Sequence, residues 1–240
     1  MKAVFISDAH LKDEGSKRYH NLLSLLDAVK DTIDALFIVG DFFDFWFCDN
    51  GNIYPEFRIM IDKLLDLRNH GVAINYFEGN HDFYLDEFFE TFGVRIFQDG
   101  ATFKLDDQKI FVSHGDTVDL SNRPYLVLRS FLRSRIFYLM QKGMPSAVLW
   151  RVARISSKMS KDHLARSPEG LADTMRNFSM WKFEEGYDAV ILGHCHQPVL
   201  EQYVIGGRKR TFAIPGDWVD HCSYIQYVDG DFTHSRIPSE

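Results

Sequence analysis

The chain has few cysteines, and this scarcity limits what kind of protein it can be. Three are present among 240 residues, Cys48, Cys195 and Cys222, and they are widely scattered. An odd and scattered set does not form a disulfide framework, so we expect a reducing compartment. The sequence also lacks any run of about 18 apolar residues, so no membrane-spanning helix is predicted. Its N-terminus turns polar too soon for a signal peptide, and none is expected.

Basic residues are fewer than acidic residues in the chain as a whole, 27 against 34. The formal net charge of −7 argues against nonspecific nucleic-acid binding, and no nucleic-acid partner is expected. Hydrophobic residues make up 45% of the sequence and aromatic residues 15%, which is enough for a substantial core and argues against disorder. A length of 240 residues suits one large domain, or a core domain with an insertion.

The apolar pattern predicts a layered α/β core. Short β-branched and aromatic runs alternate with helical patterns in the first half of the chain, and strand-like runs cluster at the end. Strands are predicted at residues 2–7, 34–40, 72–79, 109–115, 188–194, 209–216, 223–230 and 231–237, and helices at 18–31 and 56–70. This order is typical of a mixed sheet covered by helices.

Residues 120–182 depart from this pattern. The segment reads as mostly helical and contains twelve Lys or Arg but three acidic residues, a net charge of +9 that leaves −16 for the remainder. We predict a basic, apolar helical cap at 120–182, inserted into a core formed by 1–119 and 183–240. Arg129, Arg133 and Arg135 interrupt its apolar run, so the segment could lie on a membrane but not cross it.

Five short polar motifs follow predicted strands, at the point where each strand ends. They are SDAH (Asp8, His10), GDFFD (Asp41, Asp44), GNHD (Asn80, His81, Asp82), SHGD (His114, Asp116) and GHCH (His194, His196). Strand ends are where open α/β sheets form ligand sites. Residues two apart in an extended chain point to one side, so Asp8 should face the same point as His10. One such motif alone could be an ordinary turn, but five in this order indicate a shared metal site.

The residue types indicate which metals suit this site. Carboxylates, an amide oxygen and imidazoles fit Mn²⁺, Fe²⁺ or Zn²⁺ better than a metal selected by thiolates. The ligands are too many for one tetrahedral ion and suit two ions bridged by a carboxylate and a hydroxide. Cys195 lies between two histidines and should point away from them, so we interpret it as a packing residue, with thiolate ligation as the alternative.

In this order the five motifs resemble those of the calcineurin-like metallophosphoesterases. The resemblance implies a four-layer αββα sandwich of two mixed sheets around a dimetal centre, here with a helical cap insertion. It implies two divalent ions, Mn²⁺ first and Fe²⁺ or Zn²⁺ as alternatives. Transferred motif by motif, it places Asp8, His10, Asp41 and His196 on one ion and Asp41, Asn80, His114 and His194 on the other, with Asp41 bridging.

The same resemblance gives His81 a catalytic role without making it a ligand. Its ring is expected to face the phosphate, where it can stabilise the phosphoryl group or protonate the leaving oxygen. Asp82 is expected to orient this imidazole and to favour its protonated form. Asp44 and Asp116 are predicted to support the ligands, either as direct neighbours of them or as structural residues.

Further segments, spread over essentially the whole chain, are similar to the UDP-2,3-diacylglucosamine hydrolases of lipid A synthesis. They are GDFFDFW, SHGDTV, LGHCHQP and PGDWVDHCSY. This similarity implies cleavage of the diphosphate of a UDP-linked diacyl sugar into UMP and 2,3-diacylglucosamine 1-phosphate, with manganese. It implies a cytoplasmic enzyme held peripherally at the inner membrane of a Gram-negative bacterium. It suggests substrate contacts at Asn80, His81, Asn122, Ser157, Lys161 and His194.

Two questions stay open from the sequence. The apolar residues of the cap could line a chamber for acyl chains, or they could be the cap's own core. His81 stands where the lipid A hydrolases have an arginine and matches the wider family instead. The alternative is therefore a phosphodiesterase or phosphatase acting on another nucleotide or amphipathic phosphate ester. A binding scaffold without catalysis is disfavoured, because every expected ligand and His81 are present. The oligomeric state is not predicted.

Overall fold

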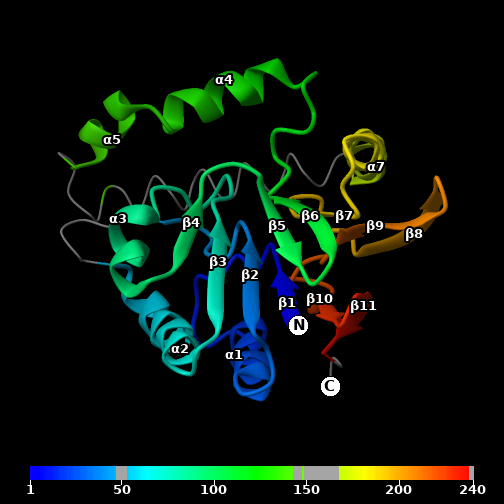
Figure 1. Cartoon of the computed structure of the whole chain (residues 1–240). Coiled ribbons are helices and arrows are strands. Elements are labelled where there is room, and N and C mark those ends of the chain that lie inside the picture. Colours follow the sequence, from blue (N-terminus) through cyan, green and yellow to red (C-terminus); the bar gives the residue numbers. More distant parts are fainter. Residues whose placement is uncertain (47–52, 143–147, 149–167, 238–240) are drawn as a thin grey trace.

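The first of two sheets carries the N-terminus and the C-terminal hairpin. A computed structural model describes residues 1–46, 53–142, 148 and 168–237 (Figure 1). In these residues the first sheet has the strand order β11-β10-β1-β2-β3-β4. Its strands are β1 (Lys2–Ile6), β2 (Ala35–Val39), β3 (Ala73–Phe77), β4 (Arg95–Phe97), β10 (Ser223–Val228) and β11 (Asp231–Arg236). Strands β1 to β4 are parallel to one another, so their carboxyl ends meet at one edge.

The second sheet has the order β5-β6-β7-β9-β8. Its strands are β5 (Ala101–Leu105), β6 (Gln108–Ser113), β7 (Ala189–Leu192), β8 (Val199–Ile205) and β9 (Arg208–Ile214). The central strands β6, β7 and β9 are parallel, and the two outer strands are antiparallel to their neighbours. Both sheets are therefore mixed, and each presents a set of parallel strand ends.

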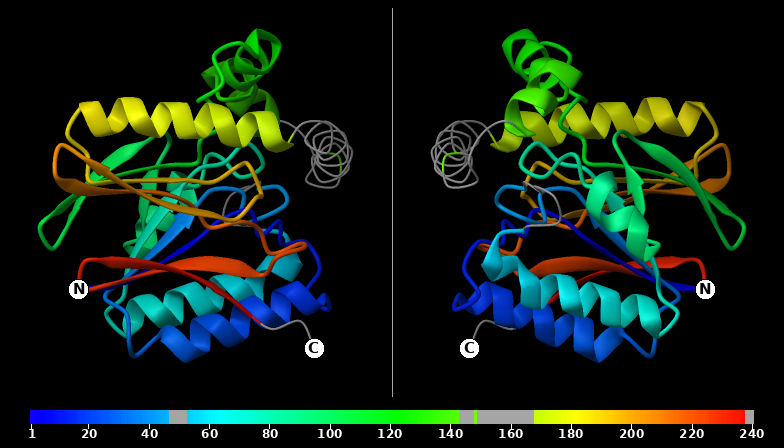
Figure 2. Two further views of the ribbon diagram at one scale, coloured as in Figure 1. Left: turned by 90° about the vertical axis from the view of Figure 1, so that its right-hand side faces the viewer. Right: turned by 90° about the vertical axis from the view of Figure 1, so that its left-hand side faces the viewer.

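Helices cover the outer face of each sheet (Figure 2). Helices α1 (Lys17–Val29) and α2 (Arg58–Asn69) lie against the first sheet, and α7 (Pro168–Glu184) lies against the second. Short elements complete the order: η1 (Pro55–Phe57), α3 (Asp86–Phe89), η2 (Glu90–Phe92), α4 (Arg123–Leu132) and α5 (Arg135–Lys142). The four layers and two mixed sheets confirm the predicted fold class.

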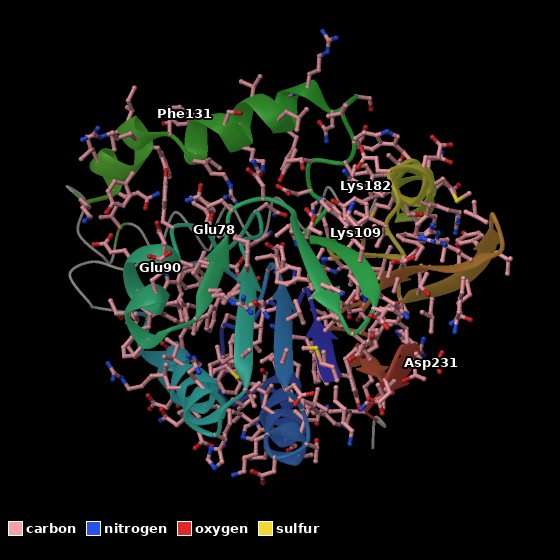
Figure 3. The ribbon with its side chains drawn as sticks, viewed as in Figure 1. Glu78, Glu90, Lys109, Phe131, Lys182 and Asp231 are labelled. Carbon is pink, nitrogen blue, oxygen red and sulfur yellow. The ribbon has the colours of Figure 1, made fainter. Side chains whose placement is uncertain are left out.

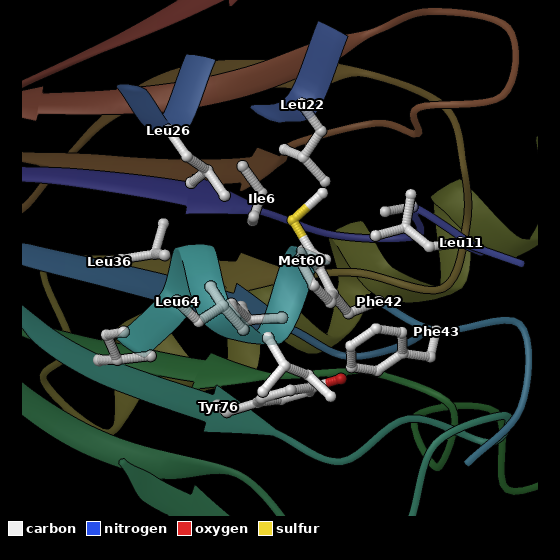
Figure 4. Packing of buried hydrophobic residues seen from close by; sticks show 14 of the residues in the cluster. Ile6, Leu11, Leu22, Leu26, Leu36, Phe42, Phe43, Met60, Leu64 and Tyr76 are labelled. Atoms are coloured by element: carbon white, nitrogen blue, oxygen red, sulfur yellow. The ribbon is translucent and has the colours of Figure 1, made fainter. Parts of the chain in front are cut away.

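Apolar side chains fill the space between each pair of layers. Leu22 and Leu26 of α1 pack with Met60 and Leu64 of α2 against Ile6 and its neighbours on the first sheet (Figure 4). Between the sheets, the rings of Phe5 and Phe37 stack with their centroids 4.5 Å apart. All five residues of β2 are buried because this strand has a helix layer on one face and the second sheet on the other. Each such side chain contributes about 1.5–3 kcal/mol through burial.

The residues predicted to form a cap fall into two groups in the described structure. Helix α7 joins the core, because Met175 and Phe183 are buried against Val190 and Phe212 of the second sheet. Helices α4 and α5 instead lie across the carboxyl ends of the strands (Figure 1). Whether 120–182 forms a distinct unit stays a prediction. Among the described residues, no helix combines the length and apolar character needed to cross a membrane.

Candidate metal centre

The five motifs meet where parallel strands of both sheets end. Asp8 and His10 follow β1, Asp41 follows β2, and Asn80 follows β3 in the first sheet. In the second sheet, His114 directly follows β6, and the GHCH motif, His194 to His196, follows β7. Because both sheets end at this edge, side chains from five segments far apart in the chain converge on one point.

The backbone at these positions differs from what the sequence suggested. Five of the predicted ligands have left-handed backbone, with φ of 53° at Asp8, 44° at His10, 51° at Asp41, 65° at His194 and 61° at His196. The extended i, i+2 geometry that was expected is therefore wrong, although the paired side chains do face one region. Sharp left-handed turns after the strands aim them there, and such conformations persist only where the surroundings hold them.

Asp8, His10 and His196 form one cluster. Each offers a ligand atom, and these three atoms lie within 4.8 Å of one another. His196 Nε2 is 3.5 Å from Asp8 Oδ1 and 3.3 Å from His10 Nε2. These are the residues that the family resemblance places on one ion, together with Asp41.

Asp41, His114 and His194 form the second cluster, with the same 4.8 Å limit between ligand atoms. His114 Nε2 lies 3.7 Å from Asp41 Oδ1 and 3.2 Å from Asn80 Oδ1. The other oxygen of the Asp41 carboxylate, Oδ2, is 3.8 Å from His10 Nε2 of the first cluster. Asp41 thus stands between the two clusters, which is the position of a bridging carboxylate.

Buried atoms without partners show that this donor set fits divalent cations. Asp8 Oδ1, Asp41 Oδ2 and His194 Nδ1 are buried and have no hydrogen-bond partner among the described residues. Buried polar groups are normally bonded, and each one left unsatisfied costs about 1–3 kcal/mol. Cations would satisfy all three atoms, because all three are electron-pair donors turned into the same space.

Burial sets the protonation of these groups in the metal-free protein. It raises the pKa of Asp8 to about 6, and it lowers the pKa of His10 to about 4 and that of His194 to about 3. Those two rings are therefore neutral at pH 7, the form that binds a metal. At His196 burial acts in the same direction, but the charges of Asp8 and Asp217 outweigh it and raise the pKa to about 9.

Two glycines leave room for ligands. A Cβ on Gly40 would lie 2.3 Å from His114 Nδ1, and its φ of +84° is one that other residues rarely adopt. A Cβ on Gly79 would lie 2.0 Å from Asp41 Oδ1. The glycines that begin the GDFFD and GNHD motifs are therefore steric requirements of the site.

His81 lies at the edge of both clusters. Its Nε2 is 3.9 Å from Asp41 Oδ2, and its ring meets that of His10 edge-on at 4.8 Å between centroids. Its Nδ1 is 2.9 Å from the carbonyl oxygen of Asp44, which favours the tautomer with the proton on Nδ1. This leaves Nε2 directed toward the space between the ligands.

The contacts of Asp82 give it a different role from the one expected. Its carboxylate accepts hydrogen bonds from the backbone amides of Asp41, Phe42, Phe43 and Gly79 and from the hydroxyl of Tyr76, at 2.5–3.2 Å. Burial and the charge of Asp41 raise its pKa to about 7. Asp82 thus holds the Asp41 and Asn80 loops together, where it was expected to orient the His81 ring.

Asp44 and Asp116 act differently from each other. Asp44 Oδ1 lies 3.5 Å from His10 Nδ1, as expected for a partner of a ligand. Asp116 Oδ2 instead accepts from the Tyr125 hydroxyl at 2.7 Å and from Arg129 Nε at 2.6 Å. Asp116 therefore connects the metal centre to α4.

The predicted substrate-binding residues of the cap are only partly described. Asn122 caps the N-terminus of α4, where its side chain accepts from the Tyr125 amide at 3.4 Å. Ser157 and Lys161 lie outside the described residues. Cys195 is buried against the second sheet with Leu192 and Phe212, in agreement with a packing role.

Asp217 is a residue of the site that sequence reasoning missed. It is 1% exposed and lies after β9, with Oδ2 3.5 Å from His196 Nδ1. The signal was present, because a strand, a glycine and an aspartate occur here as they do at Gly40 and Asp41. The PGDW segment belongs to a stretch similar to known enzymes, but that similarity assigns Asp217 no role.

The chain is similar to known proteins over most of its length. The family model described as calcineurin-like phosphoesterase matches residues 1–198. A UDP-2,3-diacylglucosamine hydrolase of Pseudomonas entomophila is 28% identical over 228 residues, which cover 94% of each chain. One of Stenotrophomonas maltophilia is 28% identical over 249 residues, covering 100% of both. A solved archaeal phosphodiesterase has a TM-score of 0.52 at 15% identity, covers 99% of this chain and 100% of its own, and so shares the fold.

The match and the geometry agree. The family model spans well over half of the chain, including all five motifs, and proteins of this family use a dinuclear metal centre. Among the described residues, the two histidine and aspartate clusters above are groups that could each hold a metal ion. The chain therefore belongs to the calcineurin-like phosphoesterase family and is a metal-dependent hydrolase.

Proposed function

We propose that the protein hydrolyses the diphosphate of UDP-2,3-diacylglucosamine to UMP and 2,3-diacylglucosamine 1-phosphate, a step of lipid A synthesis. Relatives of that name match nearly the full length of the chain. The observation that carries the proposal is an apolar helical face beside a buried cluster of metal ligands. A substrate with two acyl chains and a diphosphate needs both features in one place.

The apolar face belongs to α4 and α5. No residue of α4 is buried, and Val127 is 70% exposed and Phe131 49% exposed. Ile136 and Leu139 continue the face on α5. Figure 3 places Phe131 on α4, with Glu78 beneath it near the end of β3. Because each buried CH₂ contributes about 0.8 kcal/mol, acyl chains lying on this face would add substantially to binding.

Two divalent ions would be bound, with Mn²⁺ as the preferred metal. One would be held by Asp8, His10, Asp41 and His196, and the other by Asp41, Asn80, His114 and His194. Such a pair supplies hydroxide at neutral pH and neutralises charge on phosphoryl oxygens. The protein's part is to hold these imidazoles and carboxylates in a fixed arrangement. Asp82 and the left-handed turns supply that rigidity.

His81 is the residue proposed to move a proton. In hydrolysis, water adds to phosphorus, one P–O bond of the diphosphate breaks, and the leaving oxygen gains charge. The His81 ring lies beside Asp41 with Nε2 directed toward the ligand cluster. A proton on Nε2 would stabilise the phosphoryl oxygens or pass to the leaving oxygen. Asn80 and His194, which would hold an ion, would also adjoin the substrate phosphate.

We also propose that the protein works in the cytoplasm, held peripherally at the inner membrane. The exposed apolar face of α4 and α5 is accompanied by basic residues, of which Arg123, Arg135 and Lys142 are themselves exposed. Anionic headgroups attract such residues while the apolar side chains enter the interface. Partition of the protein onto anionic vesicles, and its loss in Phe131→Asp, would test this.

The experiment for the activity compares two substrates with Mn²⁺ added. UMP release from UDP-2,3-diacylglucosamine is followed beside hydrolysis of bis(p-nitrophenyl) phosphate, with Asp41→Ala as the inactive control. We expect efficient UMP release that depends on both Mn²⁺ and the acyl chains. Cleavage of the soluble diester without UMP release would reject the lipid substrate and keep the dimetal chemistry.

His81 also favours a second candidate. A histidine at this position supports a phosphodiesterase or phosphatase that acts on another nucleotide or amphipathic phosphate ester. The two candidates separate on His81→Arg. For a lipid A hydrolase, His81→Arg should release UMP faster than His81→Ala does, because the arginine can still stabilise the phosphoryl oxygens. For a phosphodiesterase or phosphatase built around the histidine, the two variants should lose rate equally on every substrate.

A further inference from the structure

The two carboxylate oxygens of Asp217 have different partners. One is bonded to backbone amides of its own turn, and the other faces the predicted metal ligand His196. Oδ1 accepts from the backbone amides of Val219, Asp220 and His221 at 2.7–3.0 Å. Oδ2 lies 3.5 Å from His196 Nδ1 and 3.2 Å from His221 Nδ1. The three amide bonds fix the carboxylate, so its second oxygen presents a stationary acceptor to the His196 ring.

We propose that Asp217 is a positioning residue that selects the tautomer and the orientation of His196. An acceptor at Nδ1 keeps the proton on that nitrogen and leaves the lone pair on Nε2. Nε2 is the atom that faces Asp8 Oδ1 and His10 Nε2. This inference rests on the proposed dimetal function and adds a residue to it.

The arrangement is repeated at the other histidine of the same cluster. His10 Nδ1 lies 3.5 Å from Asp44 Oδ1, so a carboxylate stands behind both imidazoles beside Asp8. The second cluster differs, since His114 Nδ1 is 2.9 Å from the backbone carbonyl oxygen of Val39. Carboxylates polarise an imidazole more strongly than a neutral carbonyl does. Loss of Asp217 should therefore weaken one ion of the pair and spare the other.

The place of Asp217 is built into the fold, so its direction toward His196 is not incidental. A Cβ on the preceding Gly216 would lie 2.3 Å from Ser223 Oγ, and the Gly216 carbonyl accepts from the Ser7 hydroxyl at 2.9 Å. Ser7 directly precedes the ligand Asp8. The turn that carries Asp217 is thus tied to the strand end that carries the cluster.

Asp217→Asn is the variant that isolates this role. The asparagine oxygen can still accept the three turn amides, whereas its NH₂ group would meet the Nδ1 proton of His196. Asp220→Asn is the matched control, because it removes one negative charge from the same turn at an exposed side chain. Metal-free full-length protein is titrated with Mn²⁺ by calorimetry for the wild type and both variants, and the thermal midpoint of each metal-free form is recorded.

We expect two Mn²⁺ ions to bind the wild type. In Asp217→Asn, one of the two affinities should fall by about 10–100-fold and the other should stay unchanged. Asp220→Asn should match the wild type, and the metal-free midpoints should agree. In phosphodiester assays, added Mn²⁺ should restore the saturated rate of Asp217→Asn.

Two results would overturn the inference. Wild-type affinity for both ions in Asp217→Asn would leave Asp217 as a turn residue only. If the affinities for both ions fell equally and the thermal midpoint of metal-free Asp217→Asn also fell, Asp217 would have a structural role. If the wild type itself bound no Mn²⁺, the dimetal centre would be refuted and this inference with it. If the wild type bound two ions and Asp217→Asn bound them equally well, only this inference would be refuted.

Discussion

Arg133 joins α4 to the loop that carries Asn80 and His81. Its Nη1 donates to Glu78 Oε2 at 2.5 Å, and its Nη2 donates to the Gly79 carbonyl at 2.8 Å. The Glu78 side chain is 1% exposed and the Arg133 side chain is 14% exposed. Since α4 has no buried residue, polar contacts of this kind hold it over the metal centre. We predict that Arg133→Gln undocks α4.

The expected magnitude follows from the burial of Glu78. Removing one partner of a buried ion pair leaves an uncompensated charge, which costs about 3–5 kcal/mol. The docked state should lose close to this amount, because the pair is short and nearly inaccessible to solvent. A surface ion pair would contribute about 0–1 kcal/mol, so the two cases are easily separated.

The loss should depend on pH with a defined sign. Burial raises the pKa of Glu78 in the folded protein, and Arg133 opposes that rise. Without Arg133 the folded pKa rises further above the unfolded value, so stability falls as pH increases from the unfolded pKa to the folded one. The deficit of Arg133→Gln should therefore be larger at pH 8 than at pH 5.

Hydrogen exchange and urea unfolding measure these effects. Amides of residues 123–132 should exchange faster in Arg133→Gln, and a double-mutant cycle with Glu78→Gln should give a coupling free energy of at least about 2 kcal/mol. Arg135→Gln, at an exposed arginine of α5, is the control. Unchanged exchange in α4, or a coupling below about 0.5 kcal/mol, would refute the polar docking of this helix.

Four further outcomes are expected. Asp41→Ala should lose both bound metal and activity in metal analysis and rate assays; a metal-replete active variant would exclude a bridging role. His81→Ala should lower the rate about 10²–10⁴-fold with metal retained. Phe131→Ser should slow UMP release from the diacyl substrate and leave bis(p-nitrophenyl) phosphate cleavage unchanged. Neither amide atom of the buried Asn75 has a partner among the described residues, so Asn75→Leu should raise the unfolding free energy by about 1–3 kcal/mol; a decrease would reveal a bonded amide.

The central strands could be predicted from the sequence because both of their faces are buried. Strand β2 is a continuous apolar run, and it and the other predicted strands are found in the structure. Strands β4, β5 and β8 were missed. They lie at sheet edges and carry charged residues such as Lys104, which is exposed, and Glu201, which pairs with Arg176 of α7, so their apolar signal is diluted. Edge strands depend on neighbours that a local pattern does not contain.

The candidate site was predictable as a set of residues but not as a geometry. The strand-end motifs named the clustered residues, because parallel strands bring their ends together. Local sequence did not reveal that the ligand turns are left-handed, or that Asp82 would bind backbone amides of a loop forty residues away. Such contacts are made across strands, and spacing along the chain does not encode them. The metal identity, the substrate and the membrane location stay predictions.

The left-handed turns restrict which amino acids this centre can use. All five ligands in that conformation are aspartate or histidine, and with asparagine these are the residues that tolerate it best after glycine. A glutamate or cysteine could donate electrons to a metal as well as they do, yet at these positions either would also have to bear the conformational cost. The backbone conformation thus limits which residue types can serve as ligands, whichever metal is bound. Replacing ligands within Asp, Asn and His should change metal preference while the loops keep their shape.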